Sequence, residues 1–181
     1  MDEQTMYQET MQPPAKKPFY KNWWVWAIAA VVIVLAIALF SGGDAVQDDL
    51  LDYINNDTTE MNKLDAKVYD LYEKARNSED DYSMYTILTN EVIPESQKLI
   101  DEAEGLVIET KEVKEVHEVY LDAINKQNQA FTLMLSALEN QDYTVITQAN
   151  EKLDEARKLM RDYESAIKEL AKEYDVEISY E

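Results

Sequence analysis

The sequence predicts an all-α protein in which an N-terminal transmembrane helix precedes an antiparallel four-helix bundle with long helices. Three observations lead to this fold class. Residues 23–40 are apolar without a single charge, and beyond Gly43 the chain holds only one glycine, Gly105, and one proline, Pro94. Apolar residues in that remainder recur every three or four positions. Scarce helix breakers and this spacing indicate long amphipathic helices rather than strands joined by glycine-rich turns.

The apolar run WWVWAIAAVVIVLAIALF has the length of a membrane span. Its eighteen residues would form a helix of about 27 Å, close to the hydrocarbon thickness of a bilayer. Cleavage as a signal peptide near Ala36–Ala38 is the alternative, but the run continues through Leu39 and Phe40, which favours an uncleaved anchor. Aromatic residues and a lysine mark the expected membrane interface: Phe19, Tyr20, Lys21, Trp23, Trp24 and Trp26.

Charge on the two sides of the run predicts its orientation. Residues 1–22 carry three lysines close to the run and are rich in proline and polar residues, which predicts a disordered cytoplasmic tail. Acidic residues follow the run, and the first basic residue after it is Lys63. We therefore expect a single-pass cell-membrane protein whose residues 41–181 form an acidic extracytoplasmic helical bundle.

Four amphipathic stretches predict the bundle helices. The first has one polar residue, Asp57, on its apolar stripe, and the second contains Pro94, which should kink it or shift its start. Asp142 is a suitable N-cap near the start of the fourth. The tail 176–180 alternates apolar and polar residues and is either a short extended segment or frayed. The predicted helices cover about residues 50–75, 83–104, 110–140 and 142–174.

Composition excludes several kinds of chemistry. The chain has no cysteine and one histidine, so it has neither disulfides, nor a thiol nucleophile, nor a cysteine zinc site. A net charge of −20 argues against nucleic acid as a partner, because phosphate binding needs a basic face. Three glycines cannot build a glycine-rich phosphate loop. We expect a non-enzymatic protein without catalytic, cofactor-binding or metal-binding residues.

Three polar features have both a structural and a functional interpretation. His117 lies among glutamates and is interpreted as a surface residue, with a haem ligand as the weaker alternative. Gln127 interrupts the apolar stripe of the third helix, either at its boundary or as a polar layer beside a small pocket. The acidic stretch 77–81 is interpreted as a solvated, capped loop rather than a weak divalent-cation site.

Tyrosines provide the best candidates for partner contact. Ten of the twelve tyrosines follow the membrane segment, and tyrosine is favoured in interfaces because it combines a flat apolar ring with a hydroxyl. Tyr82, Tyr85 and Tyr143 fall near loops that should meet at one end of the bundle. We predict that these three residues contact a partner.

Several stretches of the chain resemble known proteins. PPAKKPFYKNWWVWAIAAVVIVLAIALF resembles the N-termini of single-pass membrane proteins of Gram-positive bacteria. NEVIPESQKLIDEAE and NEKLDEARKLMRDYESAIKELAKEYDVEI are similar in style to their uncharacterised extracytoplasmic helical domains, and loosely to putative cell-wall-binding lipoproteins, although the lipobox cysteine is absent. The resemblance implies an extracytoplasmic protein that binds a protein partner or a cell-wall polymer. A membrane regulator, sensor or inhibitor, whose outer bundle binds a ligand or a neighbouring protein, is the alternative.

Overall fold

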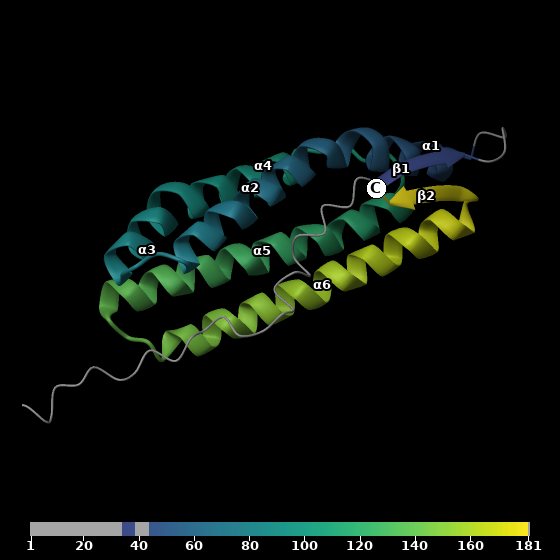
Figure 1. The fold of residues 1–181 in the computed structure, drawn as a ribbon. Helices are drawn as coiled ribbons and strands as arrows, with labels where there is room; N and C mark the ends of the chain where they lie inside the picture. Colours follow the sequence, from purple (N-terminus) through teal and green to yellow (C-terminus); the bar gives the residue numbers. More distant parts are fainter. Residues whose placement is uncertain (1–33, 39–43, 181) are drawn as a thin grey trace, which may run out of the picture.

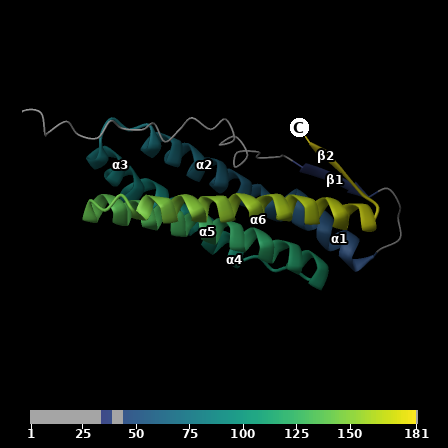
Figure 2. The same cartoon turned by 90° about the horizontal axis from the view of Figure 1, so that it is seen from below.

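The structure, a computed structural model, describes residues 34–38 and 44–180. These residues are almost entirely helical, with two short strands added (Figures 1 and 2). The all-α class is therefore confirmed. The elements in chain order are β1 (Val34–Ala38), α1 (Ala45–Asp52), the π-helical segment η3 (Tyr53–Asp57), α2 (Thr58–Arg76), α3 (Asp81–Ile87), the π-helical segment η4 (Leu88–Val92), α4 (Ile93–Glu104), α5 (Lys111–Asn140), α6 (Val145–Glu173) and β2 (Val176–Tyr180).

The helical elements form four long helices that lie side by side (Figure 1). The first long helix consists of α1, η3 and α2, and the second consists of α3, η4 and α4; α5 and α6 are the third and fourth. Each of the three connections between them is short, so consecutive helices run in opposite directions. A shared apolar core fills the space between them; its largest fully buried side chains are Tyr53, Phe131, Leu50, Met61, Leu88, Leu99 and Ile124.

The π-helical segment η3 explains the acidic residue on the first apolar stripe. Ile54 and Met61 are buried, and the residue between them that is buried is Thr58 rather than Asp57. A π turn holds one residue more than an α turn, so it moves the inward position along by one. The Thr58 hydroxyl then donates to the Ile54 carbonyl at 2.8 Å. Asp57 consequently lies at the boundary of the core, which corrects its predicted place on the stripe.

Pro94 has the effect on the second helix that its ring chemistry predicts. Proline has no N–H to donate, and inside a helix its ring displaces the preceding turn. Here the wide turn of η4 comes directly before it, with the Ile93 N–H donating to the Leu88 carbonyl, and Pro94 falls in the first turn of α4. The predicted disturbance thus takes the form of a π segment.

Two carboxylates link neighbouring helices, and the sequence spacing predicts neither contact. Glu95 of α4 is buried and pairs with Lys67 of α2 at 2.8 Å and with Lys98 at 3.1 Å. The hydrogen bond from Lys67 lowers the pKa of Glu95. Asp49 of α1 accepts from the Thr110 N–H at 2.9 Å, directly before α5 begins. These contacts fix the first helix against the second and third.

The two strands form a small antiparallel sheet at one end of the helices (Figure 2). Its register pairs Val34 with Tyr180 and Ala38 with Val176. The chain turns out of α6 at Asp175, whose φ of 53° is left-handed. The extended interpretation of the tail is therefore confirmed.

Strand β1 occupies part of the predicted transmembrane segment. Those five residues form a strand rather than the expected helix. The rest of 23–40 and the tail 1–22 lie outside the described residues, as do the predicted interface residues Phe19, Tyr20, Lys21, Trp23, Trp24 and Trp26. Among the helices that the structure describes, none combines the length and the apolar character needed to cross a membrane.

Candidate functional site

Helix α3, which carries Tyr82 and Tyr85, and the connection from α5 to α6, which carries Tyr143, lie at the end of the molecule opposite the small sheet (Figure 1). We call this surface, formed by Tyr82, Tyr85 and Tyr143, the tyrosine end. Asp80 caps α3 there, because its carboxylate accepts from the Ser83 N–H at 2.7 Å. Aspartate is favoured before a helix because its carboxylate accepts hydrogen bonds from the free N–H groups of the first helical turn. The interpretation of residues 77–81 as a capped loop is confirmed.

Side-chain hydrogen bonds hold the tyrosine end together. The Tyr143 hydroxyl donates to Asp81 at 2.5 Å, and that bond raises the pKa of Tyr143. The Tyr85 hydroxyl donates to Glu139 at 3.4 Å. Residues more than fifty positions apart are thereby joined, and the prediction that the three tyrosines share one end is confirmed.

Two of the three tyrosines at this end are exposed to solvent, and Tyr85 is half-buried. Tyr82 is 79% exposed and Tyr143 is 53% exposed. Acidic residues lie near these tyrosines along the chain or are hydrogen-bonded to them: Glu79, Asp80, Asp81, Glu139 and Asp142. In the part of the chain that the structure describes, no three histidine, aspartate or glutamate side chains are close enough to hold a metal ion.

Asp142 does not cap α6 directly as predicted. The helix begins at Val145 after Thr144, and Asp142 accepts from the Thr144 N–H at 3.1 Å and from its hydroxyl at 2.6 Å. These bonds lower the pKa of Asp142, the Thr144 hydroxyl contributing most. The aspartate therefore shapes the loop that presents Tyr143.

The second polar cluster lies inside the molecule and centres on His117. This residue is only 4% exposed, so the prediction of a surface histidine is wrong. Its Nε2 lies 2.9 Å from the Ala103 carbonyl, which can only accept, so we assign the ring proton to Nε2. Nδ1 then accepts from the Tyr53 hydroxyl at 3.0 Å. Burial lowers the pKa of His117, which keeps the ring neutral.

A third aromatic residue extends this network across the core. The Tyr163 hydroxyl lies 3.3 Å from the Tyr53 hydroxyl, and because Tyr53 donates to His117 it must accept from Tyr163. We call Tyr163, Tyr53 and His117 the polar chain. With the Ala103 carbonyl it joins all four long helices, so a shift of any one of them would break one of these hydrogen bonds. Burial raises the pKa of Tyr163 to about 12.

Sequence spacing contains a signal for the position of His117. Val113, Val116 and Tyr120 of α5 are buried, and residue 117 lies on the same helical face. The charged neighbours of His117 predict a surface position, but residues adjacent in sequence lie on other faces of a helix. The apolar periodicity instead indicates the buried position.

Asp65 adds a titratable group beside the polar chain. Its Oδ1 is sealed from solvent and has no hydrogen-bond partner. Burial raises the pKa of Asp65 to about 7, and its charge contributes to the raised pKa of Tyr120. The Tyr120 hydroxyl is also buried without a partner, and its ring lies 5.2 Å from that of Tyr163. Carboxyls with strongly shifted pKa values cluster at functional sites, and structural networks shift them as well.

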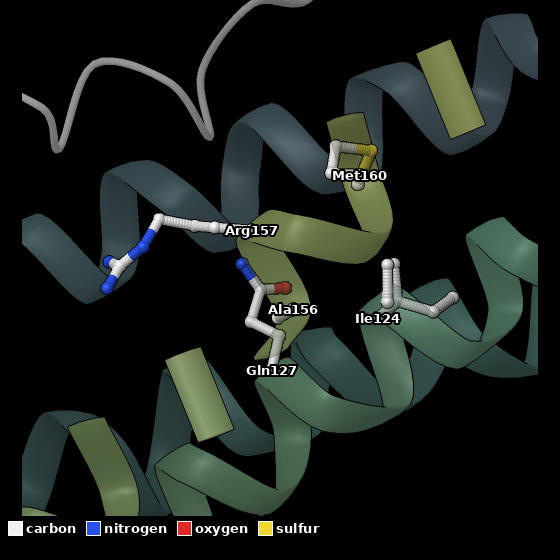
Figure 3. A pocket seen from close by; sticks show the side chains of 6 residues that line it. Ile124, Gln127, Ala156, Arg157 and Met160 are labelled. Atoms are coloured by element: carbon white, nitrogen blue, oxygen red, sulfur yellow. The ribbon is translucent and has the colours of Figure 1, made fainter. Parts of the chain in front are cut away.

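Gln127 lines a small interior pocket, as the alternative interpretation proposed, but the other lining residues are mostly apolar rather than a polar layer. It is 6% exposed, so the boundary interpretation is wrong, and its Oε1 has no hydrogen-bond partner. Figure 3 shows its amide reaching up beside α6, while the guanidinium of Arg157 extends away. The pocket there has a volume of about 10 Å³ and is lined by Ala123, Ile124, Gln127, Ala156, Arg157 and Met160. That volume suits about one water molecule and is far too small for an organic ligand.

Comparisons of this chain with protein families, with curated proteins and with solved structures find no match.

Proposed function

We propose that this protein is a non-enzymatic, membrane-anchored protein whose extracytoplasmic antiparallel four-helix bundle binds a protein partner through the tyrosine end. The proposal combines the apolar, charge-flanked segment 23–40 with the resemblance to membrane-anchored helical proteins of Gram-positive bacteria. The observation that carries it is the pair of exposed tyrosines, Tyr82 and Tyr143, among carboxylates, with the Tyr143 hydroxyl hydrogen-bonded to Asp81.

The arrangement of the helices supports this role for the tyrosine end. An anchor at residues 23–40 places the start of α1 beside the membrane. The tyrosine end lies at the other end of the long helices, and α5 alone has 30 residues, a length of about 45 Å. A surface held at that distance from the bilayer can meet proteins in the extracytoplasmic space.

The chemistry of the tyrosine end favours a basic partner segment. Carboxylates attract lysine and arginine side chains, and tyrosine rings add cation–π contacts of about 0.5–1 kcal/mol each at exposed sites. The hydroxyl of Tyr143 is held by Asp81, so its ring loses less conformational entropy on binding. An anionic wall polymer would be repelled by the same carboxylates unless cations bridged the two.

Affinity purification from membranes tests the proposal. We expect the full-length protein to retain a discrete protein partner, and Tyr82→Ala to lose it, whereas Val107→Ala at the opposite end should retain it. Val107 is a suitable control because it is also highly exposed, at 86%. Equal retention by both variants would refute the assignment to the tyrosine end, and recovery of wall polymer alone would favour polymer binding.

A regulatory or sensor function is the second candidate, and one observation favours it. Strand β1 comes from the segment expected to anchor the protein, and it contacts η3, which carries Tyr53 of the polar chain. A change in the anchor could therefore reach the core. Deletion of residues 2–20 without loss of function would count against signalling across the membrane.

A further inference from the structure

Strand β2 accepts a strand from the segment that sequence assigns to the membrane. The register of five consecutive residue pairs, from Val34–Tyr180 to Ala38–Val176, defines the contact. Strand β1 also contacts η3 and α1, while β2 continues directly from α6. The acceptor surface is therefore built by the extracytoplasmic part of the chain, and its occupant comes from the apolar segment.

The strand and a membrane helix cannot exist together. If β1 stays on β2, the apolar residues before it are 23–33, eleven residues that would span only about 16 Å as a helix. A bilayer core is about 30 Å thick, so this remnant is too short to cross it. The whole of 23–40 reaches about 27 Å, but only if residues 34–38 become helical.

We propose that β2 is a strand-accepting surface for the chain's own Val34–Ala38, and that membrane insertion of residues 23–40 removes this strand. The proposal rests on the anchoring role proposed above. Two-stranded sheets are marginal in water, whereas an uncharged run of eighteen apolar residues inserts favourably into a bilayer. Insertion of residues 23–40 should therefore predominate where a membrane is present, and strand β1 should form where no membrane is present.

The proposal gives the acceptor surface a function. Before insertion, β1 satisfies one edge of β2 and withdraws five residues of the apolar segment from other strands, which limits edge-to-edge aggregation. After insertion, that edge of β2 and the surface of η3 lose this cover. Entry of the anchor into the membrane therefore changes the surface of the bundle through the release of β1.

Disulfide trapping tests the proposal cleanly, because the natural chain has no cysteine. Ala36 and Ile178 are paired in the register, and facing residues in antiparallel strands have the Cα separation that a disulfide needs. The full-length variant Ala36→Cys/Ile178→Cys is synthesised without cells in the presence of vesicles of phosphatidylcholine and phosphatidylglycerol in equal parts, and then oxidised. The control, Ala36→Cys/Glu177→Cys, is one position out of register, on the opposite strand face.

A second variant carries the same cysteine pairs, keeps β1 intact and prevents membrane insertion. Ala30→Lys and Val31→Lys place charges at the centre of the run, where they strongly oppose insertion, but lie outside β1. We expect the protein with the natural run to resist extraction at high pH and to cross-link at least about tenfold less than the lysine variant. The out-of-register control should cross-link poorly in both.

The outcomes separate failure of this inference from failure of the anchor. Membrane-inserted protein that cross-links as fully as the lysine variant would overturn strand release and leave the anchor in place. Protein with the natural run that stays extractable would overturn the anchor itself, and the inference with it. A lysine variant that cross-links no better than the out-of-register control would overturn the strand pairing.

Discussion

Asp65 should make the protein less stable as pH rises, and Asp65→Asn should remove that effect. Burial raises its pKa from 3.8 to about 7 in the folded state. The folded protein therefore holds a proton that the unfolded chain releases. The contribution of Asp65 to stability is complete below pH 3.8 and is lost progressively as the pH rises to about 7.

The shift sets the size of the effect. Each unit of pKa difference corresponds to about 1.36 kcal/mol, so the full shift is about 4 kcal/mol. Asp65 is half-buried as a residue although its Oδ1 is sealed, and movement toward water reduces the penalty. We expect the difference in unfolding free energy between Asp65→Asn and wild type to be about 2 to 4 kcal/mol larger at pH 8 than at pH 4, in favour of the variant.

Urea unfolding at a series of pH values measures this difference. The pKa of His117 is lowered, so its own contribution is lost as pH falls, but that contribution is common to both proteins and cancels. Asp70→Asn is the matched control, since Asp70 is exposed on the same helix, and it should stay within about 0.5 kcal/mol of wild type. An Asp65→Asn profile parallel to that of wild type would refute the assignment of a buried, protonated carboxyl.

Three further substitutions test other parts of the structure by urea unfolding. Tyr53→Phe removes both hydrogen bonds of the polar chain and should destabilise by about 2–3 kcal/mol, because the buried Nδ1 of His117 loses its donor and the Tyr163 hydroxyl loses its acceptor; an unchanged midpoint would contradict the chain. Gln127→Met replaces a buried carbonyl oxygen that has no partner with an apolar group of similar volume, and should stabilise by about 1 kcal/mol; a loss of stability would show that Gln127 has a partner. Tyr82→Ala should stay within about 0.5 kcal/mol of wild type, since the ring is exposed; a large loss would mean that the ring supports the fold.

The helical class and the approximate helix ranges could be predicted from sequence because apolar periodicity is a local signal. The third helix was expected over about 110–140 and lies at Lys111–Asn140. Asp57 and Thr58 show where this approach fails. A π segment moves the inward position by one residue, and nothing in the local spacing marks it.

The interior polar groups depend on contacts that no local pattern contains. Tyr53 and His117 are 64 positions apart, and Tyr53 and Tyr163 are 110 apart. The charged neighbours of His117 along the chain predict a surface position, whereas the side chain is buried. For Asp65, the one available signal is an aspartate among the apolar residues of the first helix.

The tyrosine end could be predicted because its residues flank loops. Tyr82 follows the cap of α3, and Tyr143 lies in the loop before α6, so antiparallel packing brings them to one end. The hydrogen bonds from Tyr143 to Asp81 and from Tyr85 to Glu139 were not predictable, because the relative rotation of the helices sets them.

Photocross-linking in living cells tests the central claim most directly. A photoreactive phenylalanine derivative replaces Tyr82 in the full-length protein, and in a second strain it replaces Val107, which is also highly exposed and lies at the opposite end. Mass spectrometry then identifies what each position captures. The proposed function predicts one discrete extracytoplasmic protein, contacting through a basic segment, captured from residue 82 and not from residue 107. Capture of the same protein equally from both positions, or of no protein from residue 82, would contradict it.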